Sequence, residues 1–345
     1  MTAARRKVPS LVWTLLKVAV AAGVVALMFH KDMIRLEDLR RGAAQWPLLV
    51  ASLFAILGVL FIQSQRWGAL LRAQDIHIRP WPLYGLMMTG FFFNVVAPGG
   101  LGGDAVKAFL VARGQTKKAA AATTVFLDRF LGLATLLFVS CVVIALDFDR
   151  LWNAPLERLS AFGLPGGRVL VLAIVLCLGS MVAVALLLMS RRVRRSAVFR
   201  ACARIVPFRA TVKNVYEAMH VYRSHPRMLT GAAVASLVAQ APLFVIYYAY
   251  GLAVGADIEF WHCALIVPPA MVIRVLPLLP GGAGQGVIAM GLLFPIVGVQ
   301  EGGAIGALGD AIFMIAYLCG GFFFLFGKAS YREMRTVAET AHDDQ

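Results

Sequence analysis

The sequence predicts an all-α polytopic membrane protein that contains two inverted-topology repeats. Three observations support this fold class: long apolar runs, the distribution of lysine and arginine between the loops, and a Pro-Gly-Gly motif that occurs twice. Hydrophobic residues make up 60% of the chain, whereas soluble globular proteins contain about 45–50%. A helix needs about 20 apolar residues to cross a hydrocarbon core of about 30 Å. The runs therefore predict membrane-spanning helices, which satisfy their own backbone hydrogen bonds.

The apolar runs differ in their continuity. Simple spans are predicted at 10–29, 47–64, 119–147, 168–190, 229–252 and 304–327. The first follows Arg5-Arg6-Lys7 as a signal peptide would, but it is long for one and no clear cleavage site follows, so we expect a retained span. Two further stretches, 81–112 and 262–298, are each interrupted near the middle by Pro-Gly-Gly.

Lysine and arginine in the loops predict the orientation. Five segments are basic and are expected on the cytoplasmic side: 1–9, 65–80, 113–118, 191–228 and the stretch after 327. Segments with a higher ratio of acidic to basic residues are expected on the outer side: 30–46, 148–167, 253–261 and 299–303. Both flanks of 81–112 are basic, so it is predicted to enter and leave on the cytoplasmic side as a re-entrant hairpin. The same argument makes 262–298 a hairpin that enters from outside, with both termini cytoplasmic.

The two interrupted stretches share a motif. Pro-Gly-Gly-x-Gly begins at Pro98 and again at Pro280, and an aspartate, Asp128 or Asp310, follows thirty residues after each proline. Broken helices that meet near the midplane of inverted repeats are a transporter architecture. We predict one transmembrane domain over 1–345, with repeat one at about 47–147, a linking span and basic cytoplasmic segment at 148–228, and repeat two at about 229–327. The alternative is that each motif is an ordinary turn between helices.

Polar residues inside apolar segments are the candidate substrate-binding residues, because charge within a membrane is costly and commonly functional. Arg274 is a cation in an otherwise uncharged stretch, and its expected partner is a lipid phosphate or Asp310. Tight packing explains the glycines equally well. Asp104 and Lys107 could pair locally, or Lys107 could approach a headgroup. Asp128 and Arg129 could be functional, or they could form structural ion pairs that hold helices together. Arg66 and Trp67 are interpreted as an interfacial anchor. The candidates are Asn94, Gly99, Gly100, Gly102, Asp104, Lys107, Asp128, Arg129, Arg274, Gly281, Gly282 and Asp310.

Several functional classes find no support in the sequence. The net charge of +15 lies mainly in segments that flank apolar spans, so the positive-inside rule explains it and nucleic-acid binding is not expected. The five cysteines and six histidines show no metal-ligand or disulfide spacing. No nucleotide-binding or catalytic motif is present, so we expect no enzyme activity, no catalytic residue, no metal and no cofactor.

These motifs resemble a known family. The stretch from Asn94 to Lys107, the Asp128-Arg129-x-x-Gly132 motif and the second glycine motif resemble the lysylphosphatidylglycerol synthase transmembrane-domain family, whose members are also described as flippase-like. The resemblance covers about 10–327 and implies movement of lipids or lipid-linked molecules between leaflets. The aminoacyl-transferase domain of the synthase members is lacking, so lysyl transfer is not expected. The chain departs from the family pattern at two places: aspartate replaces the usual glutamate before Arg129, and no glutamate follows Gly284. These departures leave the identity of the substrate and any proton coupling open.

The expected function is therefore translocation of a lipid or lipid-linked molecule by an integral protein of a bacterial cytoplasmic (inner) membrane. Its partners would be membrane lipids, including those with anionic headgroups, and a homo-oligomer stays open. Two alternatives remain. The same scaffold could transport a small polar solute or ion, or the chain could be a non-transporting subunit of a lipid-modifying enzyme.

Overall fold

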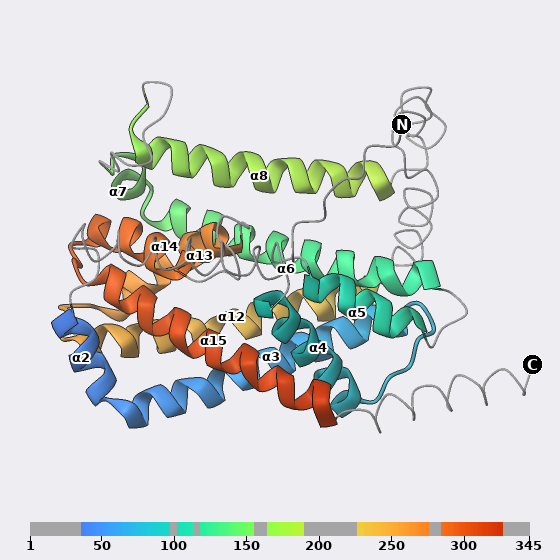
Figure 1. The fold of residues 1–345 in the computed structure, drawn as a ribbon. Helices are drawn as coiled ribbons and strands as arrows, with labels where there is room; N and C mark the ends of the chain where they lie inside the picture. The colour runs from blue at the N-terminus through green and yellow to red at the C-terminus, as the bar shows by residue number, and fades with distance from the viewer. Residues whose placement is uncertain are drawn as a thin grey trace, which may run out of the picture.

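The computed structural model describes residues 36–96, 102–113, 118–154, 164–189, 226–275 and 284–326. These residues form helices and connecting turns, with no strand among them (Figure 1). The predicted span at 10–29, most of the basic segment 191–228 and the cores of both Pro-Gly-Gly motifs lie outside the described residues.

Five described helices are long and apolar enough to cross a membrane. They confirm the five predicted spans that lie within the described residues. In order they are α3 (Trp46–Arg72), α6 (Lys118–Leu146), α8 (Gly166–Met189), α12 (Pro226–Val254) and α15 (Gly302–Phe326). Large apolar side chains such as Phe54, Leu176 and Phe322 are exposed on them, as expected of surfaces that face lipid tails.

Shorter helices fill the two interrupted stretches. The first stretch contains α4 (Pro80–Val96) and α5 (Gly102–Arg113), and the second contains α13 (Phe260–Val275), α14 (Gln285–Leu293) and the 3-10 helix η3 (Phe294–Val297). Gly284 precedes α14 with a φ of 80°, a conformation that glycine adopts without strain. Figure 1 shows α4 and α5 toward one end of the long helices and α13 and α14 toward the other.

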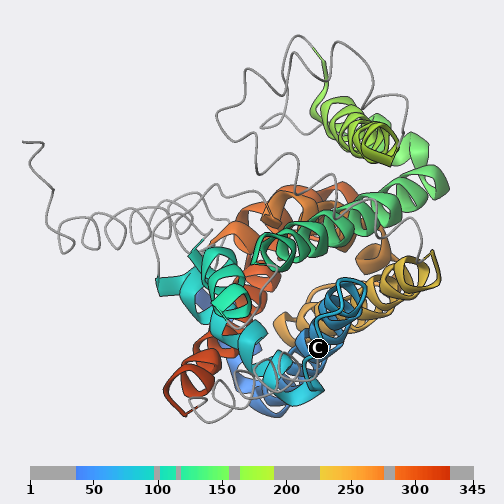
Figure 2. The same ribbon diagram turned by 90° about the vertical axis from the view of Figure 1, so that its right-hand side faces the viewer.

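The long helices pack around the short ones. Helix α3 packs along α12, α4 packs on α15, and α13 packs on α6. Helix α8 contacts α6 and α7 (Phe148–Trp152) and stands apart from the bundle (Figure 2). The remaining helix, α2 (Leu36–Ala44), lies against α12 and α15.

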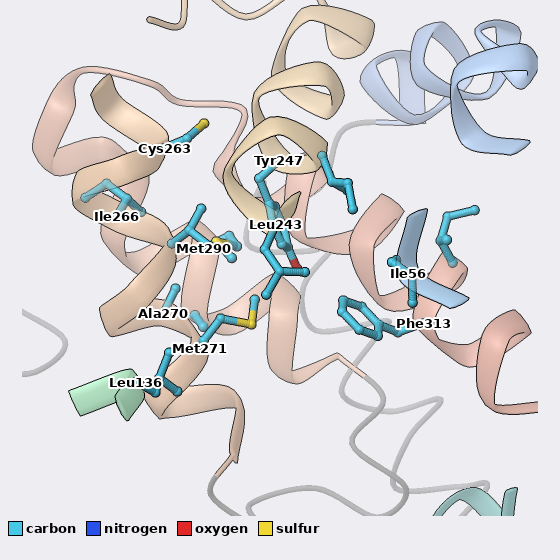
Figure 3. Packing of buried hydrophobic residues seen from close by; sticks show 14 of the residues in the cluster. Ile56, Leu136, Leu243, Tyr247, Cys263, Ile266, Ala270, Met271, Met290 and Phe313 are labelled. Carbon is cyan, nitrogen blue, oxygen red and sulfur yellow. The ribbon is translucent and has the colours of Figure 1, made fainter. Parts of the chain in front are cut away.

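The core lies between α12 and its neighbours. Leu243 and Tyr247 of α12 lie between Met290 of α14 on one side and Ile56 of α3 and Phe313 of α15 on the other (Figure 3). Glycines allow the backbones of the short and long helices to approach closely. A side chain on Gly306 or Gly302 of α15 would collide with backbone atoms of α14. Gly302 and Gly306 have the GxxxG spacing that commonly marks close helix packing, and such packing is present here.

Candidate functional site

Three groups of charged side chains lie inside the helical bundle. The first joins α5 to α6 and consists of Asp104, Lys107 and Arg129; it is called the α5 cluster below. Arg129 Nε donates to Asp104 Oδ2 at 2.7 Å and its Nη2 donates to Oδ1 at 3.1 Å. Lys107 Nζ lies 2.9 Å from the same Oδ1. One carboxylate thus holds two cations, and the expected local pairing of Asp104 with Lys107 is present.

The packing around Lys107 explains how a lysine is accommodated there. Its Nζ lies 5.6 Å from the ring centroids of both Trp67 and Phe91, and cation–π attraction offsets part of the cost of burying the ammonium group. Its aliphatic stem packs on Gly90, where an added Cβ would come within 2.6 Å of the stem. Asn94 Oδ1 accepts a hydrogen bond from Gly103 N at 2.9 Å, so Asn94 ties α4 to the first turn of α5.

The second group joins α3, α6 and α12. Arg66 Nε donates to Asp128 Oδ1 at 2.9 Å, and Arg66 Nη1 donates to Ser236 Oγ at 2.9 Å. Only 8% of the Arg66 side chain and 3% of the Asp128 side chain are exposed. Neighbouring Trp67 is also buried and donates from Nε1 to Thr124 Oγ1 at 3.1 Å. The interpretation of Arg66 and Trp67 as an interfacial anchor is therefore wrong, because both side chains point into the bundle.

The third group lies at the second interrupted stretch. Arg274 Nη2 lies 3.0 Å from Asp310 Oδ1, and its Nη1 donates to the Tyr247 hydroxyl at 3.1 Å. The Phe313 ring covers the guanidinium, with Cζ 4.1 Å from the ring centroid. Asp310 also accepts from the Gly286 amide at 2.9 Å. Of the two partners considered for Arg274, the structure supplies Asp310.

Aromatic side chains connect the first and third groups. Phe91 of α4 stacks on Tyr317 of α15 with centroids 4.8 Å apart, and Tyr317 lies 5.9 Å from Phe313. Tyr317 also interacts electrostatically with both Arg129 and Arg274. Tyr317 of α15 thus links Arg129 of α6 to Arg274 of the second interrupted stretch.

The three groups differ in exposure. Arg129 keeps 44% of its side-chain surface exposed, whereas Arg274 keeps 14% and Arg66 8%. Arg129 lies eleven residues after the start of α6, about 16 Å along the helix axis at 1.5 Å per residue. An arginine with 44% of its side chain exposed thus lies within a helix of membrane length.

The sequence prediction found part of this arrangement. Asp104, Lys107 and Arg129 form the α5 cluster, and Asn94 caps the first turn of α5. Asp128 belongs to the second group, and Arg274 and Asp310 form the third. Gly102 begins α5. Gly99, Gly100, Gly281 and Gly282 lie outside the described residues.

Sequence reasoning missed Arg66, Ser236, Tyr247 and Tyr317. A charged residue inside an apolar helix indicates a buried ionic contact, and Arg66 is such a residue. The sequence prediction assigned Arg66 to the loop 65–80, so this indication was lost. The described residues contain no group of three or more His, Cys, Asp or Glu that could hold a metal.

The described helices and their internal charges define a class: an integral membrane protein of the polytopic α-helical type with ionic groups inside the bundle. A family model, lysylphosphatidylglycerol synthase TM region, matches residues 14–331. The chain belongs to this family, which links it to lipid metabolism or translocation. Searches of curated proteins and of solved structures gave no match.

Proposed function

We propose that this protein moves a lipid or lipid-linked molecule between membrane leaflets. The observation that carries the proposal is the α5 cluster, in which the partly exposed Arg129 of α6 pairs with Asp104 of the helix that begins after the break in the first apolar stretch. Lipid translocation needs such a place, because a polar headgroup cannot cross hydrocarbon without polar partners. The acyl chains would remain in lipid while the headgroup passes the cluster.

The helix contacts support inverted repeats as part of the proposal. If α3, α4, α5 and α6 are matched in order with α12, α13, α14 and α15, the contacts correspond. Helix α4 packs on α15, just as α13 packs on α6, and the two first helices pack on each other. Related halves that bring broken helices together at a shared interface are typical of secondary transporters.

Re-entrant hairpins and cytoplasmic termini are further parts of the proposal. Helix α4 has 17 residues and α14 has 9, fewer than the about 20 residues that a full crossing needs. Thiol labelling in spheroplasts tests the first hairpin, with single cysteines placed at His77 before the stretch and at Gln115 after it. We expect both to react only from the cytoplasmic side, and opposite sidedness would show that 81–112 crosses completely.

Leaflet exchange in liposomes tests the function. Fluorescent lipids would be followed by quenching from outside, with protein-free liposomes and an unrelated polytopic protein as controls. We expect the purified protein to accelerate exchange of at least one lipid class beyond both controls. Phosphatidic acid, phosphatidylglycerol, phosphatidylcholine and a polyprenyl phosphate would be compared, with and without a pH gradient or a membrane potential.

The two alternative functions predict other results. A solute transporter would accelerate uptake of a soluble compound and leave lipid exchange at the control rate. A non-transporting subunit would do neither alone, and it would co-purify with an enzyme. The proposed location is a bacterial cytoplasmic membrane, and exchange by the reconstituted protein alone would show that no catalytic partner is needed.

A further inference from the structure

We infer that the α5 cluster is a phosphate-binding site, in which Arg129 binds the anionic headgroup, the buried Lys107 adds a second positive charge, and Asp104 is the internal carboxylate that the phosphate displaces from Arg129. The inference deepens the proposed function, on which it rests, by naming the chemical class of the substrate. It also separates Arg129 from Arg274, which the sequence treats as equivalent candidates.

The charges distinguish the α5 cluster from the other two groups. Arg66 with Asp128 contributes one cation and one carboxylate, and so does Arg274 with Asp310. The α5 cluster contributes two cations and one carboxylate. Asp128 also interacts electrostatically with Lys107 and Arg129, and the α5 cluster taken together with Arg66–Asp128 has three cations and two carboxylates. The surplus positive charge among these described groups therefore lies around α5 and α6, whereas Arg274–Asp310 is balanced. A surplus charge inside a membrane is costly, and an anion bound there would neutralise it.

The geometry of Arg129 fits a planar anionic ligand. Its Nε and Nη2 already bind the two oxygens of Asp104 in a bidentate manner, at 2.7 and 3.1 Å. A phosphate presents oxygens that the same guanidinium fork can bind. Because 44% of the Arg129 side chain is exposed, a headgroup can approach this side chain while Asp104 is still bound to it. Lys107 pairs with the same carboxylate from a buried position, with 3% of its side chain exposed, and adds a second positive charge to the site.

Arg274 lacks these properties. Its guanidinium bonds Asp310 and Tyr247 and is covered by the Phe313 ring. Its carboxylate partner is also anchored, because Asp310 accepts hydrogen bonds from the Gly286 amide. Displacing Asp310 would break the ionic contact and the amide contacts at the start of α14 together. We therefore assign Arg274–Asp310 to holding α13, α14 and α15 in place.

Equilibrium binding to the purified full-length protein in detergent tests the assignment. The probes are dioctanoyl phosphatidic acid, inorganic phosphate and dioctanoylglycerol, which has the same tails without the phosphate. We expect phosphatidic acid to bind and dioctanoylglycerol to bind at least tenfold more weakly. Arg129→Gln should weaken phosphatidic acid binding at least tenfold and Arg129→Lys by less. The matched control is Arg150→Gln, because Arg150 is similarly exposed at 48% and pairs with Asp147 outside the cluster.

Asp104→Asn gives the sharpest outcome, because it predicts a gain. Removing the competing carboxylate should tighten phosphatidic acid binding several-fold, since the cations no longer have to exchange partners. If the cluster only holds α5 on α6, Asp104→Asn would lower the melting temperature and bring no tighter binding. Weaker or unchanged binding by a folded Asp104→Asn protein would overturn the assignment, as would equal affinities for phosphatidic acid and dioctanoylglycerol.

Inorganic phosphate separates the two sources of the anion. If inorganic phosphate displaces phosphatidic acid only weakly, and only at millimolar concentration, the site binds a lipid headgroup and also contacts the lipid tails. Equal affinity for both probes identifies a site for free phosphate, which supports the site but not lipid transport. Lipid exchange that is fast in liposomes yet insensitive to Arg129→Gln would overturn this inference and leave the proposed function standing.

Discussion

Removal of Arg66 should destabilise the protein strongly, because it leaves a carboxylate buried without its cation. Asp128 is 3% exposed and has Arg66 as its ionic partner, at 2.9 Å. Breaking a buried pair by removing one partner costs about 3–5 kcal/mol in soluble proteins. Arg66→Met keeps most of the packing of the aliphatic stem, so the loss reports mainly on the charge. We expect a decrease of about 3 kcal/mol or more in the free energy of unfolding.

The double variant separates the ionic contact from packing. In Arg66→Met/Asp128→Asn neither charge of this pair remains, so we expect the double variant to be more stable than Arg66→Met alone. Ser236→Ala removes one hydrogen bond to the guanidinium and should cost about 1 kcal/mol. Arg150→Met is the control, because its ion pair is exposed, and it should cost about 0.5 kcal/mol or less.

Equilibrium unfolding in mixed micelles, followed by tryptophan fluorescence as the fraction of denaturing detergent rises, measures these free energies. Buried Trp67, next to Arg66 and hydrogen-bonded to Thr124, contributes to this signal together with the other five tryptophans. A cost for Arg66→Met no larger than that of Arg150→Met would refute the reasoning. Additive costs in the double variant would refute it too, because they would show that the two charges do not stabilise each other.

Three further changes test the packing of the short helices, by melting temperature in detergent. Gly103→Ala should lower it by several degrees, because an added Cβ would collide with the Gly90 carbonyl and come within 2.6 Å of Asn94 Oδ1, whereas Gly58→Ala, with open space around it, should not lower it. Gly286→Ala should be destabilising as well, since its Cβ would take the place of the Asp310 carboxylate. Tyr317→Leu removes the stacking on Phe91 and should cost about 0.5–1.5 kcal/mol. A stable Gly103→Ala protein would show that α5 is not seated on α4 as described.

The sequence predicted the spans well because their signal is local. An apolar run of sufficient length specifies a membrane helix whatever surrounds it, and the five spans within the described residues are helices of membrane length. The interrupted stretches were also visible, because proline and glycine break helices wherever they occur. The boundaries were less accurate: α3 continues to Arg72, past the predicted end at residue 64.

The predicted end of α3 at residue 64 placed Arg66 outside the helix, and this limited what the sequence could predict about the site. Charge at the end of an apolar run is consistent with a snorkelling anchor, and only the fold shows that Arg66 meets Asp128 from a helix 62 residues away. Partners such as Ser236 and Tyr247 are small or aromatic polar residues inside apolar helices, and they have no local signature. The candidate cations and acids were found from their cost in a membrane, but the pairing required the packing of α5, α6, α13 and α15.

The central claim, that the α5 cluster carries a lipid headgroup between leaflets, is tested most directly by leaflet exchange in matched liposomes. The wild type, Arg129→Gln and Arg150→Gln would be reconstituted at equal copy number, and exchange of labelled phosphatidic acid followed in each. We expect fast exchange in the wild type and in Arg150→Gln, and a loss of at least tenfold in Arg129→Gln. Equal rates in all three proteins would contradict the claim.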